Sequence, residues 1–397
     1  MGSGPPGVAK RQQYRRHSRY GCRNCKLRKV KCDEARPQCL RCRAYGVQCT
    51  FTHNTTDLQP LLESREQNNP KSNHPDSSPR ASITNGIWAE DGMSFFNLNS
   101  HDWGLFNKFR YRTVYSLGGD ALVHIHENHM LKASFSCPFL LHGILALTAV
   151  HDRYLEISSK RRSLIESHHW SECTTLFNKW LGHDIKEEQK DPIWAATGIL
   201  NILAFSSINA SSPSDAWPQL SQDSSDLEWL SLGTGKMKLW NLINPLRPGS
   251  VFRAMCTALI QMRAPLPIEG TEGTSKDLVQ LCRMGDTSTQ ENNSYFQVVH
   301  GLSRLLRMPQ GTISIGNALM ICNYMHGQFE VLLMDKDPIA LLLLGLWYAK
   351  ARGVIWWIDF RARYEIPSIC NYLQRHYGGN NPIQALIPWD GIIQDIK

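Results

Sequence analysis

Six cysteines near the N-terminus have the residue type and the spacing of a metal centre. They follow the pattern C-x2-C-x6-C-x6-C-x2-C-x6-C and are Cys22, Cys25, Cys32, Cys39, Cys42 and Cys49. Cysteine thiolates are common ligands of zinc, and a structural zinc ion takes four ligands. Six separate thiolates would fill only one and a half such sites. If two of the six sulfurs each bridge two metals, the set fills all the positions of two tetrahedral zinc ions.

The cysteine segment repeats internally, which favours shared ligands. The run Cys22-x2-Cys25-x6-Cys32 recurs 17 residues later as Cys39-x2-Cys42-x6-Cys49. Each half can supply a short helix that begins at its C-x2-C pair, so the first cysteine of each half is best placed to bridge. A four-cysteine zinc ribbon with two spare thiols is a poorer fit, because the cysteine pairs of ribbons are normally separated by longer spacers.

Basic residues are concentrated in the same part of the chain. The first 50 residues contain thirteen Lys and Arg against two Asp and Glu, which is a net charge of +11. The rest of the chain contains thirty Lys and Arg against thirty-three Asp and Glu, which is a net charge of −3. We therefore expect a polyanionic partner to bind the N-terminal segment and not the larger remainder.

Composition divides the chain into four segments. Residues 1–20 form a basic arm with too few apolar residues to fold alone, and residues 21–51 contain the cysteine module. Residues 52–92 are rich in Asn, Ser, Pro and Gln and predict a flexible linker, without the heptads that a coiled coil requires. Residues 93–397 predict an all-helical domain. The longest apolar runs in it are shorter than the roughly 20 residues of a membrane-spanning helix.

The larger domain is predicted to be helical because its apolar residues recur at intervals of three and four. Helices are expected at 103–117, 139–150, 168–181, 194–208, 237–241, 252–260, 295–306, 315–334, 339–358 and 367–377. Residues 211–225 contain two prolines and several serines and predict a long internal loop. The expected fold is a small zinc-stabilised binuclear cluster domain and a large all-α domain, joined by a disordered linker.

The cysteine pattern resembles the fungal binuclear zinc cluster family of transcription factors. The basic residues of that family between the second and third cysteines stand here in Lys26-Leu27-Arg28-Lys29-Val30-Lys31, and its loop proline is Pro37. In that family the first and fourth cysteines bridge two zinc ions. The resemblance implies two Zn²⁺ per chain, one held by Cys22, Cys25, Cys32 and Cys39 and the other by Cys22, Cys39, Cys42 and Cys49.

The same resemblance implies double-stranded DNA as the partner. Family members place the C-terminal end of the first short helix in the major groove, over a CGG-type triplet. By position, Lys29 is the expected base-reading residue, with Arg28 beside it, because lysine donates to guanine O6 and N7. Phosphate contacts are expected mainly from Lys26, Lys31, Arg41, Arg43, Arg15, Arg16 and Arg19. For the arm arginines, a solvated charge or a nuclear import signal is an equally good interpretation.

The run from Cys137 to His151, CPFLLHGILALTAVH, resembles a helix of regulators similar to sterol uptake control proteins. Further likeness lies in Asp226–Gly233, in Pro338–Leu344 and at Trp356-Trp357. Cys137 stands where a histidine is common in those proteins. The resemblance implies an all-helical regulatory or effector domain, which in some members binds a sterol. A small apolar, sterol-like ligand is therefore a hypothesis for this domain, although the same apolar residues are also what an ordinary helical core requires.

None of the catalytic motifs considered is complete in this sequence. His126-Glu127-Asn128-His129 is one spacer residue short of a zinc-binding H-E-x-x-H motif. Gly233-Thr234-Gly235-Lys236 lacks the first glycine and the final Ser or Thr of a phosphate-binding loop. The sequence also contains no G-x-S-x-G motif. The chain is therefore not predicted to be an enzyme.

These patterns together predict a nuclear, sequence-specific transcription factor of the RNA polymerase II type. Its expected target is a metabolic gene set, such as a biosynthetic gene cluster or sterol and lipid genes. The alternative is a DNA-tethered scaffold or repressor whose helical domain only recruits other proteins. Co-regulators are expected partners in either case. Because residues 52–92 lack heptads, we expect a monomer, or a dimer that forms through the helical domain.

Overall fold

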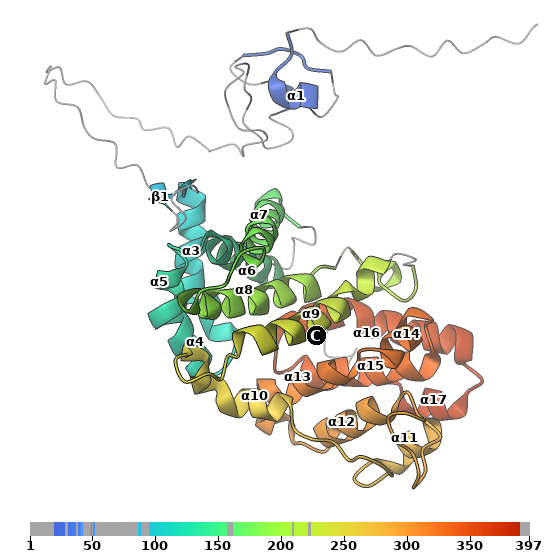
Figure 1. Cartoon of the computed structure of the whole chain (residues 1–397). Coiled ribbons are helices and arrows are strands. Elements are labelled where there is room, and N and C mark those ends of the chain that lie inside the picture. The colour runs from blue at the N-terminus through green and yellow to red at the C-terminus, as the bar shows by residue number, and fades with distance from the viewer. Residues whose placement is uncertain are drawn as a thin grey trace, which may run out of the picture. The chain divides into compact units, whose positions relative to one another are not determined.

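The chain divides into two compact units, residues 1–81 and residues 82–397 (Figure 1). The computed structural model describes residues 20–27, 31–36, 39, 40, 42, 49, 51, 86–88, 95–156, 162–208, 210–220 and 224–389. Apart from Tyr20, the predicted basic arm lies outside these residues, as does most of the predicted linker. All six cysteines of the N-terminal cluster are described, and they belong to the first unit.

The described part of the first unit contains one short helix, α1 (Arg23–Leu27). It starts directly after Cys22, where the first C-x2-C pair predicts a helix. The Lys26 amide donates to the Cys22 carbonyl oxygen at 3.1 Å and closes its first turn. In the second half of the repeat, Leu40 and Cys42 are also helical. In each C-x2-C pair the second cysteine is therefore helical and the first directly precedes a helical residue, as the repeat predicts.

The second unit begins with a short hairpin. Strand β1 (Gly86–Trp88) pairs antiparallel with β2 (Phe95–Asn97), with Ile87 opposite Phe96. Among the described residues this pair forms the only sheet. Strand β1 falls inside the range predicted as linker, and β2 falls just after it. Three-residue strands are too short to show the alternating pattern that identifies a strand in a sequence.

The rest of the second unit, as far as it is described, is helical, which confirms the predicted all-α class. Figure 1 shows α3–α8 gathered at one end and α11–α17 at the other, with α9 beside α8 and α10 between α4 and α13. Its α-helices are α3 (Ser100–Tyr111), α4 (Asp120–Ile125), α5 (Leu131–Ala133), α6 (Pro138–Leu155), α7 (Leu164–Leu181), α8 (Glu187–Phe205), α9 (Glu228–Ile243), α10 (Cys256–Met262), α11 (Lys276–Leu281), α12 (Phe296–Leu306), α13 (Ile315–Leu319), α14 (Gln328–Met334), α15 (Pro338–Ala351), α16 (Trp356–Tyr377) and α17 (Asn381–Leu386).

Short helical turns of other kinds join these helices. They are η1 (Thr113–Ser116), the π-helical η2 (His126–Met130), η3 (Pro213–Asp215), η4 (Ser224–Leu227), η5 (Val251–Met255), η6 (Gln310–Thr312) and η7 (Met320–Tyr324). Within the described residues, no helix is both long enough and apolar enough to cross a membrane.

Helix α6 is buried on almost every side, as its continuous apolar sequence predicts. Pro138 occupies the first turn, where a missing amide proton costs nothing because that amide has no partner within the helix. The helix packs against α3, α7 and α8. Its position in the middle of these three helices explains why no face of its sequence is polar.

Two long helices predicted from the sequence are each interrupted in the structure. The predicted helix at 339–358 is wrong as one element, because α15 ends at Ala351 and Ile355 is extended, with φ −134° and ψ 114°. The predicted helix at 315–334 is likewise split into α13, η7 and α14. Gly327, with φ 67°, precedes α14 in a conformation that interrupts any helix.

Helix α16 is longer than predicted. It starts at Trp356 and continues through Pro367, which the sequence suggests as a helix start. A proline inside a helix removes one backbone hydrogen bond and usually bends or ends the helix. Twelve residues of α16 are buried, so tertiary packing rather than local preference sets its length.

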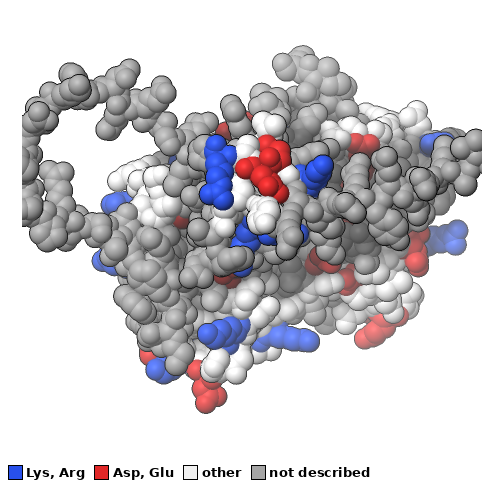
Figure 2. Space-filling model, turned by 90° about the horizontal axis from the view of Figure 1, so that it is seen from above, with Lys and Arg blue, Asp and Glu red and all other residues white. Residues whose placement is uncertain are grey.

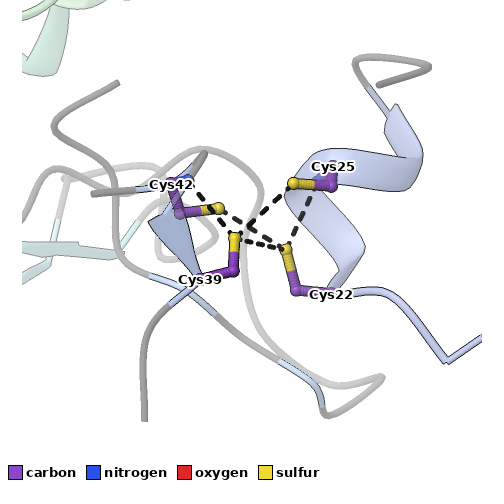
Figure 3. A group of neighbouring side chains, drawn as sticks. All are labelled: Cys22, Cys25, Cys39 and Cys42. Carbon is purple, nitrogen blue, oxygen red and sulfur yellow. Dashed lines mark hydrogen bonds between the residues drawn. The ribbon is translucent and has the colours of Figure 1, made fainter. Parts of the chain in front are cut away.

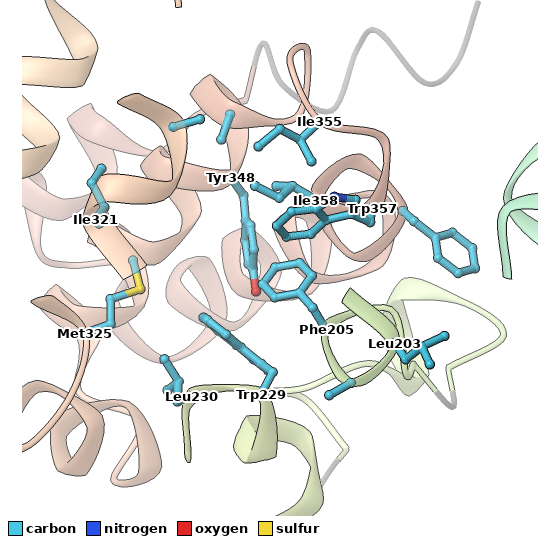
Figure 4. Packing of buried hydrophobic residues seen from close by; sticks show 14 of the residues in the cluster. Leu203, Phe205, Trp229, Leu230, Ile321, Met325, Tyr348, Ile355, Trp357 and Ile358 are labelled. Carbon is cyan, nitrogen blue, oxygen red and sulfur yellow. The ribbon is translucent and has the colours of Figure 1, made fainter. Parts of the chain in front are cut away.

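Aromatic side chains from four helices meet in the core of the second unit (Figure 4). The ring of Phe205, at the end of α8, lies 4.7 Å from the ring of Trp229 and 5.2 Å from that of Trp357. Trp347 of α15 stacks on Trp229, with 6.2 Å between ring centroids. Edge-to-face and stacked pairs of this kind each add about 0.5–1.5 kcal/mol beyond their buried area.

A charged residue, Arg361, is fully buried among these rings. Its Nε donates to the Phe205 carbonyl at 2.7 Å and its Nη1 to the Asp226 carbonyl at 3.2 Å. Its guanidinium pairs with Glu365, whose other carboxylate oxygen accepts from the Tyr348 hydroxyl at 2.7 Å. Arg361 thus fastens the end of α8 and the approach to α9 onto α15 and α16.

Candidate metal centre and nucleic-acid interface

The first cysteine of each half accepts a hydrogen bond from the backbone of its own helical turn. The Cys25 amide donates to Cys22 Sγ at 3.4 Å, and the Cys42 amide donates to Cys39 Sγ at 3.3 Å. These two bonds are equivalent in the two halves. The C-x2-C spacing therefore fixes the positions of Cys22 Sγ and Cys39 Sγ relative to their own helical turns.

The third cysteine of each half folds back on the first. The Cys22 amide donates to Cys32 Sγ at 3.4 Å, and the Cys39 amide donates to Cys49 Sγ at 3.4 Å. With the two bonds at the C-x2-C pairs, the same N–H to sulfur pattern appears twice, once in each half. The 17-residue sequence repeat is therefore also a structural repeat.

Sulfurs of the two halves meet in one group (Figure 3). Cys39 Sγ lies 3.8 Å from Cys22 Sγ and 3.7 Å from Cys25 Sγ, and Cys22 Sγ lies 3.4 Å from Cys42 Sγ. Two thiolates on one tetrahedral zinc, each about 2.3 Å from the metal, lie about 3.8 Å apart. The sulfur spacings therefore fit zinc, and none of these cysteines is in a disulfide.

Cys22 and Cys39 are the central members of the group. The sulfur of each lies within 4 Å of a sulfur of the other half. The backbone amide of each also donates to the sulfur of the third cysteine of its own half. Cys32 Sγ and Cys39 Sγ also lie within 4.8 Å of each other. The arrangement can supply Cys22 and Cys39 to both of two adjacent metal ions.

Without a metal, burial disfavours the deprotonated, negatively charged form of Cys25, Cys42 and Cys49. Five of the six cysteines are buried, while Cys49 is partly exposed. Burial and the neighbouring sulfurs hold the pKa values of Cys25 and Cys42 far above the ordinary thiol range, and burial is the largest cause of a rise in the pKa of Cys49 to about 12. A divalent cation among the sulfurs reverses this balance, because it binds and stabilises the deprotonated form.

Two of the residues predicted to contact DNA are described, and both are exposed cations. Lys26 lies in the last turn of α1, and Lys31 immediately precedes Cys32. The other predicted contacts, Arg28, Lys29, Arg41, Arg43, Arg15, Arg16 and Arg19, lie outside the described residues. On the face seen in Figure 2, the described Lys and Arg side chains are interspersed with Asp and Glu side chains.

The structure adds two cations that the sequence interpretation does not single out. Arg23 is the first residue of α1, and Arg36 is exposed, with its guanidinium 4.7 Å above the ring of Phe51. Such a cation–π contact holds the guanidinium beside the metal centre. The signal for both lies in the sequence, since they belong to the strongly basic first 50 residues of the chain.

Comparison with known proteins identifies this module. Residues 20–58 match the model of the "Fungal Zn(2)-Cys(6) binuclear cluster domain". These residues are a fungal binuclear cluster domain. The predicted resemblance is thus confirmed for this segment, and a domain of this kind with its six cysteines grouped implies zinc binding.

Curated relatives of the binuclear cluster domain align over short stretches only. A "Zn(2)-C6 fungal-type transcription factor" of Gibberella zeae is 56% identical over 36 residues, which are 9% of this chain and 7% of the relative. The "Aspercryptin biosynthesis cluster-specific transcription regulator atnN" of Emericella nidulans is 44% identical over 50 residues, 13% and 8% of the two chains. "Sterol uptake control protein 2" of Candida albicans is 38% identical over 56 residues, 14% and 8%.

Two of these relatives are named as a transcription factor and a transcription regulator, and the third as a control protein. None of the three names is that of an enzyme, in agreement with the prediction for this chain. The aligned stretches cover less than a tenth of each of these relatives' own length. Most of the helical unit lies beyond such short alignments, since α3–α17 alone span residues 100–386.

Proposed function

We propose that this chain is a nuclear, sequence-specific transcription factor whose binuclear cluster domain binds double-stranded DNA. The observation that supports this proposal most directly is the group of sulfurs. In it, Cys22 Sγ and Cys39 Sγ each lie within 4 Å of sulfurs of the other half. The proposed cofactor is two Zn²⁺ per chain, with Cys22, Cys25, Cys32 and Cys39 on one ion and Cys22, Cys39, Cys42 and Cys49 on the other. The N-terminal excess of positive charge supports DNA as the partner.

The proposed DNA site is a CGG-like triplet read by Lys29, with Arg28 beside it. Lys26, Lys31, Arg41, Arg43, Arg15, Arg16 and Arg19 are proposed to contact phosphates and so to set affinity without sequence choice. Two zinc ions and six thiolates carry a net charge of −2, which the surrounding lysines and arginines also offset. The exposed positions of Lys26 and Lys31 beside the cysteine group are consistent with phosphate contacts.

Replacing Lys29 by alanine is expected to remove discrimination between a CGG site and a scrambled site, while the zinc content stays unchanged. A lysine bonded to guanine contributes about 1–3 kcal/mol of discrimination. The measurement is a fluorescence-anisotropy titration of full-length protein against both duplexes, with zinc content measured in parallel. Lys31→Ala is the matched control and is expected to weaken binding to both duplexes equally. If Lys31→Ala alone abolished discrimination, Lys29 would not be the base-reading residue.

The helical unit, residues 93–397 in the proposed division, is the proposed regulatory or effector domain of a factor that controls a metabolic gene set. Candidate sets are a biosynthetic gene cluster and sterol or lipid genes, in keeping with the names of two relatives. Co-regulators are proposed partners, and dimerisation, if present, is proposed to occur through this unit.

The second candidate function is a DNA-tethered scaffold or repressor. Fusing residues 93–397 to an unrelated DNA-binding domain separates the two, since a factor activates a reporter and a scaffold or repressor does not.

A small apolar, sterol-like ligand of the helical unit is a further part of the proposal. Its support is the apolar character of α6 and α15, which are both almost fully buried. Saturable binding of labelled sterol by the full-length chain is the expected result. Binding that rises linearly with concentration would show that the apolar residues of α6 and α15 serve only as core.

A further inference from the structure

Three imidazoles gather where α6 packs against α7, in the helical unit and apart from the cysteine cluster. His142 comes from α6, and His168 and His169 come from α7. One ring nitrogen of each lies within 4.8 Å of the others. His142 and His169 are buried, with their Nδ1 atoms 2.9 Å apart, while His168 is exposed. The group thus has a buried base and one side that solvent can reach.

A carboxylate holds the middle imidazole in place. Asp102 Oδ1 lies 3.2 Å from His169 Nε2, and Asp102 Oδ2 accepts from the Asn99 amide at 3.1 Å. That second bond is part of a capping box in which Asn99 Oδ1 also accepts from the Asp102 amide, so the start of α3 fixes the carboxylate.

The tautomer of His169 follows from this contact. An ionised carboxylate can only accept hydrogen bonds, so Nε2 of His169 carries a proton and donates it to Asp102. In the neutral ring, Nδ1 then carries the lone pair, and Nδ1 is the atom that faces His142. A metal-bound histidine usually has this environment: one ring nitrogen donates to a carboxylate, and the lone pair of the other binds the metal. In His169 that lone pair faces another imidazole.

We propose that His142, His168 and His169 bind a divalent transition-metal ion of the kind that favours imidazole, such as Zn²⁺ or Co²⁺, with Asp102 orienting His169. Two imidazole nitrogens on one tetrahedral zinc, each about 2.0–2.1 Å from the metal, lie about 3.4 Å apart. The 2.9 Å separation of His142 Nδ1 and His169 Nδ1 therefore needs to open by only about half an ångström. Three protein ligands leave a fourth position for water on the exposed side beside His168.

The site would link three helices that are distant in sequence. Asp102 is on α3, His142 on α6, and His168 and His169 on α7. Helices α3 and α7 both pack against α6, so a bound ion would join α6 to α7 directly and α3 through the hydrogen bond between Asp102 and His169. The open coordination position leaves room for a water or another small ligand on the ion, unlike a closed four-thiolate site. Metal binding by these histidines does not depend on DNA binding by the cysteine cluster.

The competing interpretation is a hydrogen-bond chain from Asp102 through His169 to His142. It satisfies the two buried imidazoles without a metal, since one Nδ1 can donate to the other. It gives no role to the exposed His168, whose ring centroid lies 5.1 Å from that of His169 and 6.0 Å from that of His142. The two interpretations differ in whether His168 affects metal binding.

The test is a Co²⁺ titration of the full-length chain with zinc already in its cysteine cluster. Visible absorption identifies the new ion, because nitrogen and oxygen ligands give weak d–d bands without the intense thiolate charge-transfer bands. We expect one Co²⁺ per chain with such bands. His168→Ala is expected to weaken its affinity at least tenfold, and Asp102→Asn to weaken it roughly 10- to 100-fold, as lost outer-shell partners do.

His183→Ala is the matched control, because it removes another exposed imidazole next to α7. It is expected to leave Co²⁺ affinity unchanged. His168 is chosen over His142 because its exposed ring can be removed without opening the core, and circular dichroism verifies that each variant is folded. The proposal is overturned if the native chain takes up no Co²⁺ outside the cysteines. It is also overturned if His168→Ala binds Co²⁺ as tightly as the native chain.

Discussion

Replacing Cys39 by serine is expected to empty the whole cysteine cluster of metal, whereas replacing Cys49 leaves one ion bound. Cys39 Sγ lies 3.8 Å from Cys22 Sγ and 3.7 Å from Cys25 Sγ, and it accepts the Cys42 amide, so it borders both proposed ions. Cys49 serves only the second ion in the proposed assignment. Structural zinc supplies about 10–16 kcal/mol to the folding of small modules, so the loss of both ions also unfolds this one.

The measurement is the zinc content of purified full-length variants, with Zn²⁺ released by a thiol reagent counted separately from weakly held metal. Cys256→Ser is the control, because this exposed cysteine lies in the helical unit and outside the cluster. It is expected to leave thiol-bound zinc at the native level. Equal zinc loss in Cys39→Ser and Cys49→Ser would contradict a shared role for Cys39.

Arg361→Ala is expected to lower the free energy of unfolding by about 3–5 kcal/mol. The change leaves the buried Glu365 carboxylate without its cation and removes the donor for the Phe205 and Asp226 carbonyls. Burial already raises the pKa of Glu365, more than the Arg361 charge lowers it, so the carboxylate protonates more readily once the guanidinium is gone. Urea denaturation of the native chain and the variant, followed by circular dichroism, gives the difference.

Arg363→Ala is the matched control for this change. Arg363 is on the same helix and also pairs with a carboxylate four residues away, Asp359, but its side chain is 38% exposed. A partly exposed pair contributes only about 0–1 kcal/mol. The double replacement Arg361→Met with Glu365→Leu is expected to recover part of the loss, because it leaves no buried charge. Similar losses for Arg361→Ala and Arg363→Ala would show that Arg361 does not fasten the core.

The cysteine centre could be predicted from the sequence because its chemistry is local. The six cysteines lie within 28 residues, and the C-x2-C spacing alone determines which amide reaches which sulfur. The 17-residue repeat then predicts that the second half copies the first, as the bonds from Cys22 to Cys32 and from Cys39 to Cys49 show. In such a small module, spacing and ligand chemistry constrain the geometry more than long-range packing does.

Helices of the second unit can be predicted where a continuous or periodic run of apolar residues marks them. They cannot be predicted where contacts between distant residues set the ends of the helix. Helices α6 and α12 lie close to the predicted ranges because continuous or periodic apolar residues mark them. The break between α15 and α16 is marked only by Gly353, just past the end of α15, and the apolar residues that resume at Val354 make the two helices read as one by periodicity. The start of α16 was misplaced for the opposite reason, since Pro367 suggests a boundary that the packed helix overrides.

Arg361 and the three imidazoles could not be found from sequence at all. Arg361 interacts with Phe205 and Asp226, more than 130 positions away, and nothing local distinguishes it from a surface arginine. His142 meets His169 only because α6 and α7 pack side by side, and Asp102 joins them from α3. Contacts of this kind depend on tertiary structure, for which a single sequence contains no periodic signal.

The most direct test of two zinc ions sharing Cys22 and Cys39 is the native mass spectrum of a fragment of residues 15–55 expressed with zinc. The fragment contains all six cluster cysteines and none of the histidines of the helical unit. We predict a mass that corresponds to two Zn²⁺ per chain, both lost on addition of a chelator. A fully metallated species with a single Zn²⁺ would contradict the shared ligands and would favour an isolated four-cysteine site.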